Sequence, residues 1–213
     1  MIITIDGPAG SGKSTTAKLL AKELGGILLD TGAMYRSVTH IALEEKADTK
    51  DGKRMAEIAR NINIEFVENE GPQRTLVNGR DCSADIRKKS VDANVSIVAA
   101  HKDVRAEMVT LQRKIATTSN TVVCEGRDIG SVVFPDADFK FYIHADTVKR
   151  AARRALERGE EMDDAKLEEI KMRDHLDSTR KESPMIIPDG AHVIDNTDLS
   201  IDETLKKLLE LCA

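Results

Sequence analysis

The 213-residue sequence has few cysteines and no long apolar run. No run approaches the roughly 20 consecutive apolar residues that a membrane-spanning helix needs, so we expect no membrane contact. Its three cysteines are widely spaced and form no C-x-x-C pair, which predicts reduced, packed thiols in a cytoplasmic protein. The five histidines have no metal-ligand spacing, so the sequence predicts no structural zinc.

The sequence also lacks an excess of basic residues. Its 32 lysines and arginines are outnumbered by 37 aspartates and glutamates, which gives a formal net charge of −5. Because nucleic-acid surfaces are usually basic, this balance argues against a nucleic acid as a partner. No basic region followed by an apolar segment precedes the first strand-like run, so we expect no secretory signal. The length suits one α/β domain with small inserts.

The stretch GPAGSGKST, residues 7–15, matches the pattern G-x-x-x-x-G-K-[ST]. Before it, residues 1–5 form an apolar run that predicts a buried strand, and after it apolar residues recur at helical spacing. A glycine-rich turn that leads into a capped helix is the alternative interpretation, but such a turn needs neither the lysine nor two separated glycines. The order strand, glycine loop, helix therefore predicts a phosphate-binding loop for a nucleoside triphosphate.

The residue types of this stretch fit that chemistry. Glycines allow successive N–H groups to converge at a helix N-terminus, where phosphate binds favourably. Lys13 can reach the outer phosphates, and the Ser14 hydroxyl can help to hold Mg²⁺.

The rest of the chain alternates between short apolar runs and amphipathic stretches. Residues 26–30, 121–126, 139–145 and 192–195 are predicted strands, and Ser200 with Glu203 forms a capping box before the last predicted helix. This alternation predicts a parallel sheet covered on both faces, with ligands at the carboxyl ends of its strands. Asp30, Arg127 and Asp128 lie at or just after such ends.

Two segments interrupt the alternation. Residues 62–86 have an antiparallel pattern with a Gly71-Pro72 turn and an Asn78-Gly79 turn, which predicts a small β-rich insert with flanking helices. Residues 149–181 are highly charged. A solvated helical hairpin is one interpretation, but the arginines at 150, 153, 154, 173 and 180 favour a mobile lid that faces phosphates.

Other features restrict the class of nucleotide-binding protein. The sequence has no N-K-x-D stretch of a GTPase and no apolar strand ending in Asp-Glu as in remodelling ATPases. It has isolated arginines on several loops instead, at positions 36, 105, 127, 173 and 180. A single one of these could form a surface salt bridge of little consequence, but together they can hold two repelling phosphates in a kinase.

Several stretches occur in the order seen in bacterial cytidylate kinases, and the chain resembles that family over nearly its whole length. They are GPAGSGKST, LDTGAMYR, VNGRDCSADIR, VRAEMVTLQR, EGRDIGSVVFPDADFKFYIHA, RDHLDSTRKESP and HVIDNTDLS. The resemblance implies a P-loop nucleoside-monophosphate-kinase fold: a parallel five-stranded sheet flanked by helices, a small antiparallel β-rich insert that binds the monophosphate, and a helical lid. The implied domains are a core of residues 1–40, 93–148 and 182–213, an insert of residues 41–92 and a lid of residues 149–181.

The resemblance further implies the reaction of ATP with CMP or dCMP, with Mg²⁺ as cofactor and Ser14 as a metal contact. The implied ATP-binding residues are Gly7, Pro8, Ala9, Gly10, Ser11, Gly12, Lys13, Ser14, Thr15 and Arg153. The implied catalytic residues are Lys13, Arg127, Arg173 and Arg180. The residues implied to bind the monophosphate are Thr31, Arg36, Arg127, Arg173 and Arg180 at its phosphate, Tyr35 and Asp177 at its ribose, and Ser96, Arg105 and Asp128 at its base.

Two alternatives to this interpretation are a kinase for another acceptor and a protein that is not a kinase. A kinase of the same fold that acts on UMP, AMP, shikimate or dephospho-coenzyme A is not excluded by spacing or composition alone. A nucleotide-dependent switch would need few arginines near the acceptor and no closing lid, which the sequence disfavours. No apolar stripe is left without a predicted partner, so we expect a monomer.

Overall fold

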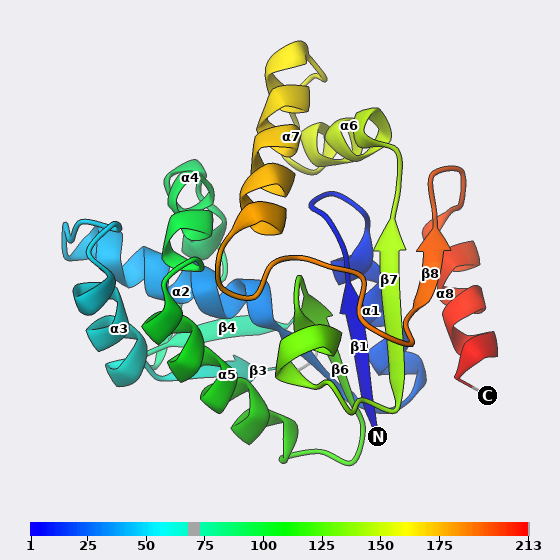
Figure 1. The fold of residues 1–213 in the computed structure, drawn as a ribbon, viewed down its shortest axis with the longest axis horizontal. Helices are drawn as coiled ribbons and strands as arrows, with labels where there is room; N and C mark the ends of the chain where they lie inside the picture. Colours follow the sequence, from blue (N-terminus) through cyan, green and yellow to red (C-terminus); the bar gives the residue numbers. More distant parts are fainter. Residues whose placement is uncertain (68–72, 213) are drawn as a thin grey trace. The chain divides into compact units, whose positions relative to one another are not determined.

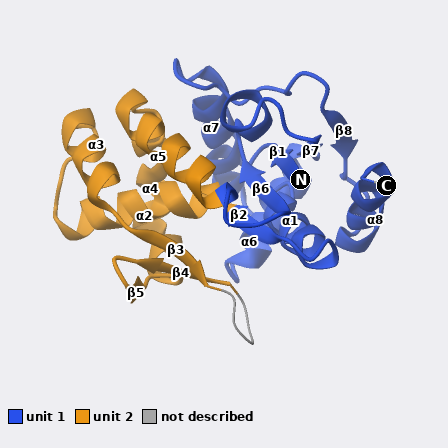
Figure 2. Ribbon diagram, turned by 90° about the horizontal axis from the view of Figure 1, so that it is seen from below, with its two compact units in different colours: residues 1–29, 116–213 blue, residues 30–115 orange. Residues whose placement is uncertain are grey.

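The computed structural model describes residues 1–67 and 73–212 (Figure 1). The chain divides into two compact units, one made of residues 1–29 and 116–213 and the other of residues 30–115, which Figure 2 distinguishes by colour.

The first unit contains a five-stranded parallel sheet in the order β2-β6-β1-β7-β8, which confirms the predicted fold class. Its strands are β1 (Ile2–Asp6), β2 (Ile27–Asp30), β6 (Val122–Gly126), β7 (Phe139–His144) and β8 (His192–Asp195). The last residue of β2, Asp30, is the first residue of the second unit.

The register of β1 and β6 determines where the two most important loops begin. Ile2 pairs with Val122 and Asp6 pairs with Gly126, so the two strands end at the same level. Residues 7–15, which we call the glycine loop, follow β1, and Arg127 and Asp128 follow β6. Both loops therefore begin next to each other at the carboxyl edge of the sheet, where α/β proteins bind ligands.

The helices of the first unit are α1 (Lys13–Glu23), α6 (Thr147–Glu157), α7 (Asp164–Thr179) and α8 (Ile201–Leu211), together with a π-helical turn at Ile129–Val133. Helices α1 and α8 share an apolar core with this sheet, whereas α6 and α7 pack in a separate cluster with Ala9. Buried Ile5 of β1 and Phe141 of β7 belong to one apolar cluster with Leu20 of α1 and Leu208 of α8. The predicted capping box starts α8, since Ser200 N donates to Glu203 Oε2 and Glu203 N donates to Ser200 Oγ.

Most of the predicted lid is helical. Helix α6 begins after Asp146, whose carboxylate accepts hydrogen bonds from the N–H groups of Val148 and Lys149. Helix α7 begins after Asp163, which accepts from Lys166 N. The structure thus shows two helices in this segment, and its closure as a lid stays a prediction.

The second unit is a helical layer with a small antiparallel sheet. Its helices are α2 (Thr31–Glu44), α3 (Gly52–Asn61), α4 (Lys89–Val98) and α5 (Lys102–Ala116), and a 3₁₀ turn spans Asp85–Arg87. Its sheet contains β3 (Ile64–Val67), β4 (Arg74–Val77) and β5 (Arg80–Asp81) in that order. Asn78 and Gly79 have φ values of 51° and 79°, as a tight hairpin turn requires, so this predicted turn is confirmed. The predicted Gly71-Pro72 turn lies outside the described residues.

Within the second unit, α2 packs against α3 and α4. Met34 and Val38 of α2, Met55 of α3 and Val91 of α4 are fully buried in this layer. The three cysteines of the protein are free; Cys82 and Cys124 are buried, and Cys212 is half-buried. Across residues 1–67 and 73–212, no helix is both long and apolar enough to cross a membrane.

Candidate active site

The glycine loop has a backbone that only glycine can adopt at several positions. Gly10 and Gly12 have φ values of 71° and 83°, in the left-handed region that disfavours other residues. A Cβ atom at Gly7 would lie 2.0 Å from the carbonyl oxygen of Ile143, and one at Gly10 would lie 2.6 Å from that of Arg150. The loop therefore turns tightly against β7 and α6 and leads directly into the N-terminus of α1.

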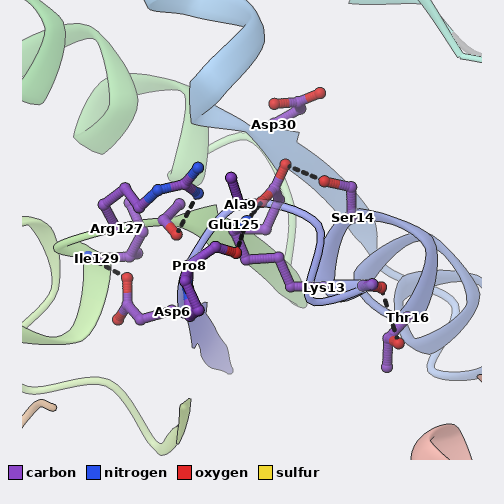
Figure 3. Close-up of polar contacts among 12 residues, drawn as sticks. Asp6, Pro8, Ala9, Lys13, Ser14, Thr16, Asp30, Glu125, Arg127 and Ile129 are labelled. Atoms are coloured by element: carbon purple, nitrogen blue, oxygen red, sulfur yellow. Dashed lines mark hydrogen bonds and ion pairs between the residues drawn. The ribbon is translucent and has the colours of Figure 1, made fainter. Parts of the chain in front are cut away.

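Lys13 and Ser14, the first residues of α1, lie beside Glu125 at the end of β6 (Figure 3). Lys13 Nζ donates to the carbonyl oxygen of Pro8 at 3.2 Å and lies 3.9 Å from Glu125 Oε2. Ser14 Oγ donates to Glu125 Oε1 at 2.8 Å. A cation and two kinds of oxygen ligand thus meet at the start of the helix.

The ammonium group of Lys13 is desolvated. Burial and, after it, the charge of Arg127 lower the pKa of Lys13 to about 7, although Glu125 opposes this shift. A bound polyanion would raise the pKa of this ammonium group again, because added negative charge favours the protonated form.

Asp6, the last residue of β1, orients the loop that follows β6. Its carboxylate accepts hydrogen bonds from the N–H groups of Ile129 at 2.7 Å and Gly130 at 2.8 Å (Figure 3). Burial raises the pKa of Asp6 to about 6, although both hydrogen bonds oppose this shift. Asp6 therefore fixes the π-helical turn directly after Arg127 and Asp128.

Arg127, Asp128, Asp177 and Arg180 form two adjoining ion pairs in the first unit. Arg127 Nε donates to Asp177 Oδ2 at 2.8 Å, and Arg180 Nη2 lies 3.3 Å from Asp128 Oδ1. Burial opposes ionisation of Asp177, but the charges of Arg127 and Arg173 outweigh it and lower the pKa of this carboxyl group. The structure thus brings together five predicted site residues from the β6 loop and the C-terminal half of α7.

A further ion pair connects both lid helices to the glycine loop. Arg150 of α6 is buried, and its guanidinium donates to the carbonyl oxygens of Ala9 at 2.9 Å and Ala145 at 3.0 Å. The same group lies 2.6 Å from Asp174 Oδ2 of α7, whose Oδ1 accepts from Ala9 N at 3.4 Å. The position of α7 is therefore coupled to the backbone of the glycine loop.

Arg153, a predicted ATP contact, is linked to the glycine loop through Asn196. Its guanidinium donates to Asn196 Oδ1 at 3.1 Å and to the Asn196 carbonyl oxygen at 2.8 Å. Asn196 Nδ2 donates in turn to the carbonyl oxygen of Ser11 at 2.9 Å. Thr15, another predicted ATP contact, is exposed on the first turn of α1.

The remaining predicted substrate residues belong to the second unit. Arg36 donates to the carbonyl oxygen of Ile86 at 3.2 Å and to Asp92 Oδ1 at 2.5 Å. The guanidinium carbon of Arg105 lies 5.3 Å from the ring centre of Tyr35, a cation–π distance. The other two predicted residues of this unit are Thr31, buried at the start of α2, and Ser96, half-buried on α4.

The sequence analysis assigned no role to four residues that organise this site. They are Asp6, Glu125, Asp174 and Asn196. The position of Asp6 and Glu125 at the carboxyl ends of predicted strands was a usable signal, because side chains there face the ligand edge of the sheet. No comparable signal marks Asp174 or Asn196.

Comparison with known proteins gives one family. The model of the family described as cytidylate kinase matches residues 3–213. A cytidylate kinase of Bacillus cereus strain G9842 is 46% identical over 213 residues, covering 98% of this chain and 94% of the relative. A cytidylate kinase of Bacillus thuringiensis strain Al Hakam is 45% identical over 211 residues, covering 97% and 93%. A solved Thermus thermophilus structure, with 19% identity, covers 100% of this chain and 98% of its own with a TM-score of 0.51, a likeness of fold.

Proposed function

Because the chain belongs to the cytidylate kinase family, we propose that it transfers the γ-phosphoryl group of ATP to CMP and dCMP, giving ADP and CDP or dCDP. The observation that carries the proposal is a buried lysine at the end of a loop whose glycines leave no room for side chains. Such a loop presents N–H groups and one ammonium to a chain of phosphates.

On the donor side, residues 7–15 would hold the ATP phosphates. The ammonium of Lys13 offsets negative charge between the β- and γ-phosphates, and charge stabilisation of this kind is commonly the largest single contribution to catalysis. Arg153 is proposed to contact ATP from α6. Its bonds to Asn196, which binds Ser11, keep it beside the loop.

The oxygens beside Lys13 fit a magnesium ion. Ser14 Oγ and the Glu125 carboxylate provide a hydroxyl and a carboxylate ligand 2.8 Å apart, and Mg²⁺ prefers oxygen ligands. When bound there, Mg²⁺ would neutralise phosphate charge. The start of α1 and the end of β6 hold Ser14 and Glu125 in place for the ion.

On the acceptor side, we assign the CMP phosphate to arginines and the base to a carboxylate. Arg127, Arg173 and Arg180 are proposed to act on the transferring group, and Thr31 and Arg36 to hold the CMP phosphate. Asp177 and Tyr35 are assigned to the ribose. Asp128, Arg105 and Ser96 are assigned to the base, where a carboxylate accepts from the 4-amino group of cytosine and opposes the 4-carbonyl of uracil.

We also propose the division of labour among segments. Residues 149–181 would close over the nucleotides and exclude water from the γ-phosphate. Residues 41–92 would form the monophosphate-binding insert, and residues 1–40, 93–148 and 182–213 the core. The ion pair of Arg150 and Asp174, which reaches from both lid helices to Ala9, would couple their movement to the glycine loop. We propose a monomer that works in the cytoplasm.

A steady-state assay across acceptors tests the proposal. With ATP and Mg²⁺, the purified protein should phosphorylate CMP and dCMP with much higher kcat/KM than UMP, AMP or shikimate. Lys13→Ala should lose about 3 kcal/mol of transition-state stabilisation, which is more than 100-fold in kcat. Lys18→Ala removes an exposed lysine from the same helix and should retain full activity.

Two outcomes would contradict the proposal. Preference for another acceptor would show that the site belongs to a kinase of different specificity. Near wild-type turnover of Lys13→Ala at saturating ATP and CMP would contradict the assignment of the phosphate-binding loop.

A further inference from the structure

We propose that the second unit contains a zinc site, formed by His40 and Glu44 of α2 and by Cys82 and Asp85 after β5. We call these four residues the His–Cys cluster. None of them has a role in the proposed phosphoryl transfer. The inference departs from the sequence analysis, which predicted no structural zinc because the histidines show no ligand spacing among themselves.

Three donors of the cluster are already close together. One nitrogen of His40, the sulfur of Cys82 and a carboxylate oxygen of Asp85 all lie within 4.8 Å of one another. Tetrahedral zinc, with Zn–N near 2.0 Å and Zn–S near 2.3 Å, holds its ligand atoms about 3.3–3.8 Å apart. Contraction by up to about 1–1.5 Å would therefore bring these three donors to coordination distance. His40 and Cys82 are buried, so their side chains cannot turn into water instead.

We propose Glu44 as the fourth ligand, from the next turn of α2; it lies outside the three-donor group, so its 43% exposed side chain would have to turn toward Cys82 and Asp85. Its Oε1 lies 3.5 Å from His40 Nε2, a separation close to that of two ligand atoms on one zinc ion. Residues four apart on a helix share a face. The cluster thus combines H-x-x-x-E on a helix with C-x-x-D on a turn.

The cluster already attracts cations. Arg80 Nη2 lies 2.6 Å from Glu44 Oε2 and 3.2 Å from His40 Nε2, and Lys88 Nζ lies 2.6 Å from Asp85 Oδ1. Because a guanidinium can only donate, a hydrogen bond from Arg80 to His40 Nε2 uses a ring lone pair, and a metal bound at Nε2 would compete for it. The side chains of Arg80 and Lys88 are 57% and 63% exposed, so a metal can displace both toward solvent.

Bound zinc would connect two parts of the second unit. One pair of ligands belongs to α2, and the other follows the short strand β5 and begins the 3₁₀ turn at Asp85. Four protein ligands leave no position open for substrate, which is typical of structural rather than catalytic zinc. The metal would stabilise the β-rich insert against α2.

Cobalt spectroscopy tests the site directly on the full-length, reduced, metal-stripped protein. We expect Co²⁺ to produce a thiolate-to-cobalt charge-transfer band at one ion per chain, and Zn²⁺ to abolish it. Cobalt at the oxygen ligands Ser14 and Glu125 gives no thiolate band, so the two sites are distinguishable without an activity assay. Cys82→Ser and His40→Gln should lose the band, whereas Cys212→Ser, which changes a thiol outside the cluster, should keep it.

Arg80→Ala provides a second, opposite test. Removing the competing guanidinium should tighten zinc binding by about tenfold or more, because zinc no longer has to displace its charge-assisted hydrogen bonds. A purely structural role for Arg80 predicts no change or weaker binding. The proposal is wrong if the wild-type protein shows no thiolate band, if the band survives in Cys82→Ser, or if Arg80→Ala weakens zinc binding. Should Cys82→Ser fail to fold, survival of the band in His40→Gln would overturn the proposal equally.

Discussion

Asp174→Asn should separate the effect of the lid helices on catalysis from their effect on stability. Asp174 accepts from the backbone of Ala9 and pairs with the buried guanidinium of Arg150, which itself binds the carbonyl oxygen of Ala9. It lies on α7 next to Arg173 and three residues before Asp177, both assigned to the acceptor site. The substitution keeps the size of the side chain, removes its charge and replaces one of its two acceptor oxygens by an NH₂ donor.

The burial of the Asp174–Arg150 pair limits how much stability and activity the substitution can cost. The Asp174 and Arg150 side chains are 20% and 6% exposed, so the pair is largely but not fully buried. Loss of one partner of a fully buried pair costs about 3–5 kcal/mol. Asparagine still accepts a neutral hydrogen bond, so we expect about 1.5–3 kcal/mol, the value of a charge-assisted bond. For a chain of this size, at about 2–4 °C per kcal/mol, that lowers Tm by about 3–12 °C. If α7 loses its position over the loop, kcat should fall about 10–100-fold, since misplaced reacting groups cost rate steeply.

The assay pairs thermal unfolding with steady-state kinetics for CMP and ATP. Glu169→Gln is the matched control, because it neutralises a carboxylate that joins α7 to Arg158 of α6 at 3.0 Å, away from the glycine loop. This control should leave kcat within about twofold and barely change Tm, because the Glu169 side chain is 45% exposed and its ion pair is screened by water. If Asp174→Asn lowers Tm but keeps wild-type kcat, the pair is only structural and our interpretation of α7 fails.

Three further predictions concern charge and motion. The pKa of Lys13, about 7 in the free protein, should rise when ATP binds, so ATP binding at pH 8 should take up nearly one proton and the Kd for ATP should increase about tenfold from pH 6 to 8. Calorimetry in buffers of different ionisation enthalpy measures the proton uptake, and equal uptake by Lys13→Gln would refute the assignment. Asp128→Ala should reduce kcat/KM for CMP far more than for UMP; an equal loss for both would mean that Asp128 supports its loop and does not contact the base. A bisubstrate inhibitor should increase hydrogen-exchange protection of residues 149–181, and unchanged protection would contradict lid closure.

Local sequence signals predicted most of the fold. The capping box at Ser200 and the Asn78-Gly79 turn are formed by neighbouring residues, so their patterns survive folding unchanged. Alternation of apolar strands with amphipathic helices fixed the parallel sheet, because both faces must be covered. Within the site, the glycine loop was equally predictable, since a continuous stretch of chain provides its geometry.

The carboxylates and amide that hold the site together were not predictable in this way. Asp6 binds Ile129 across 123 residues, and Asn196 binds Ser11 across 185. These partners are backbone groups, and any residue type presents the same N–H or C=O, so no sequence pattern marks the bond. The same reasoning applies to the His–Cys cluster, whose ligands come from a helix and a distant turn.

The buried charges of the first unit are costly in the free protein, and that cost indicates the ligand. A shift of the Lys13 pKa from 10.5 to about 7 corresponds to on the order of 5 kcal/mol lost to its ammonium form. Asp6 also lowers the free energy of unfolding as the pH rises from the ordinary pKa of 3.8 through about 6, because its carboxylate must ionise while it is buried. Asp6 is compensated by two N–H donors that orient the Arg127 loop, whereas Lys13 has a single carbonyl at 3.2 Å and a carboxylate at 3.9 Å among the described residues. The uncompensated part of the Lys13 desolvation is recovered when phosphate oxygens arrive, so the loop favours a polyanion over a neutral ligand before any contact with the acceptor is made.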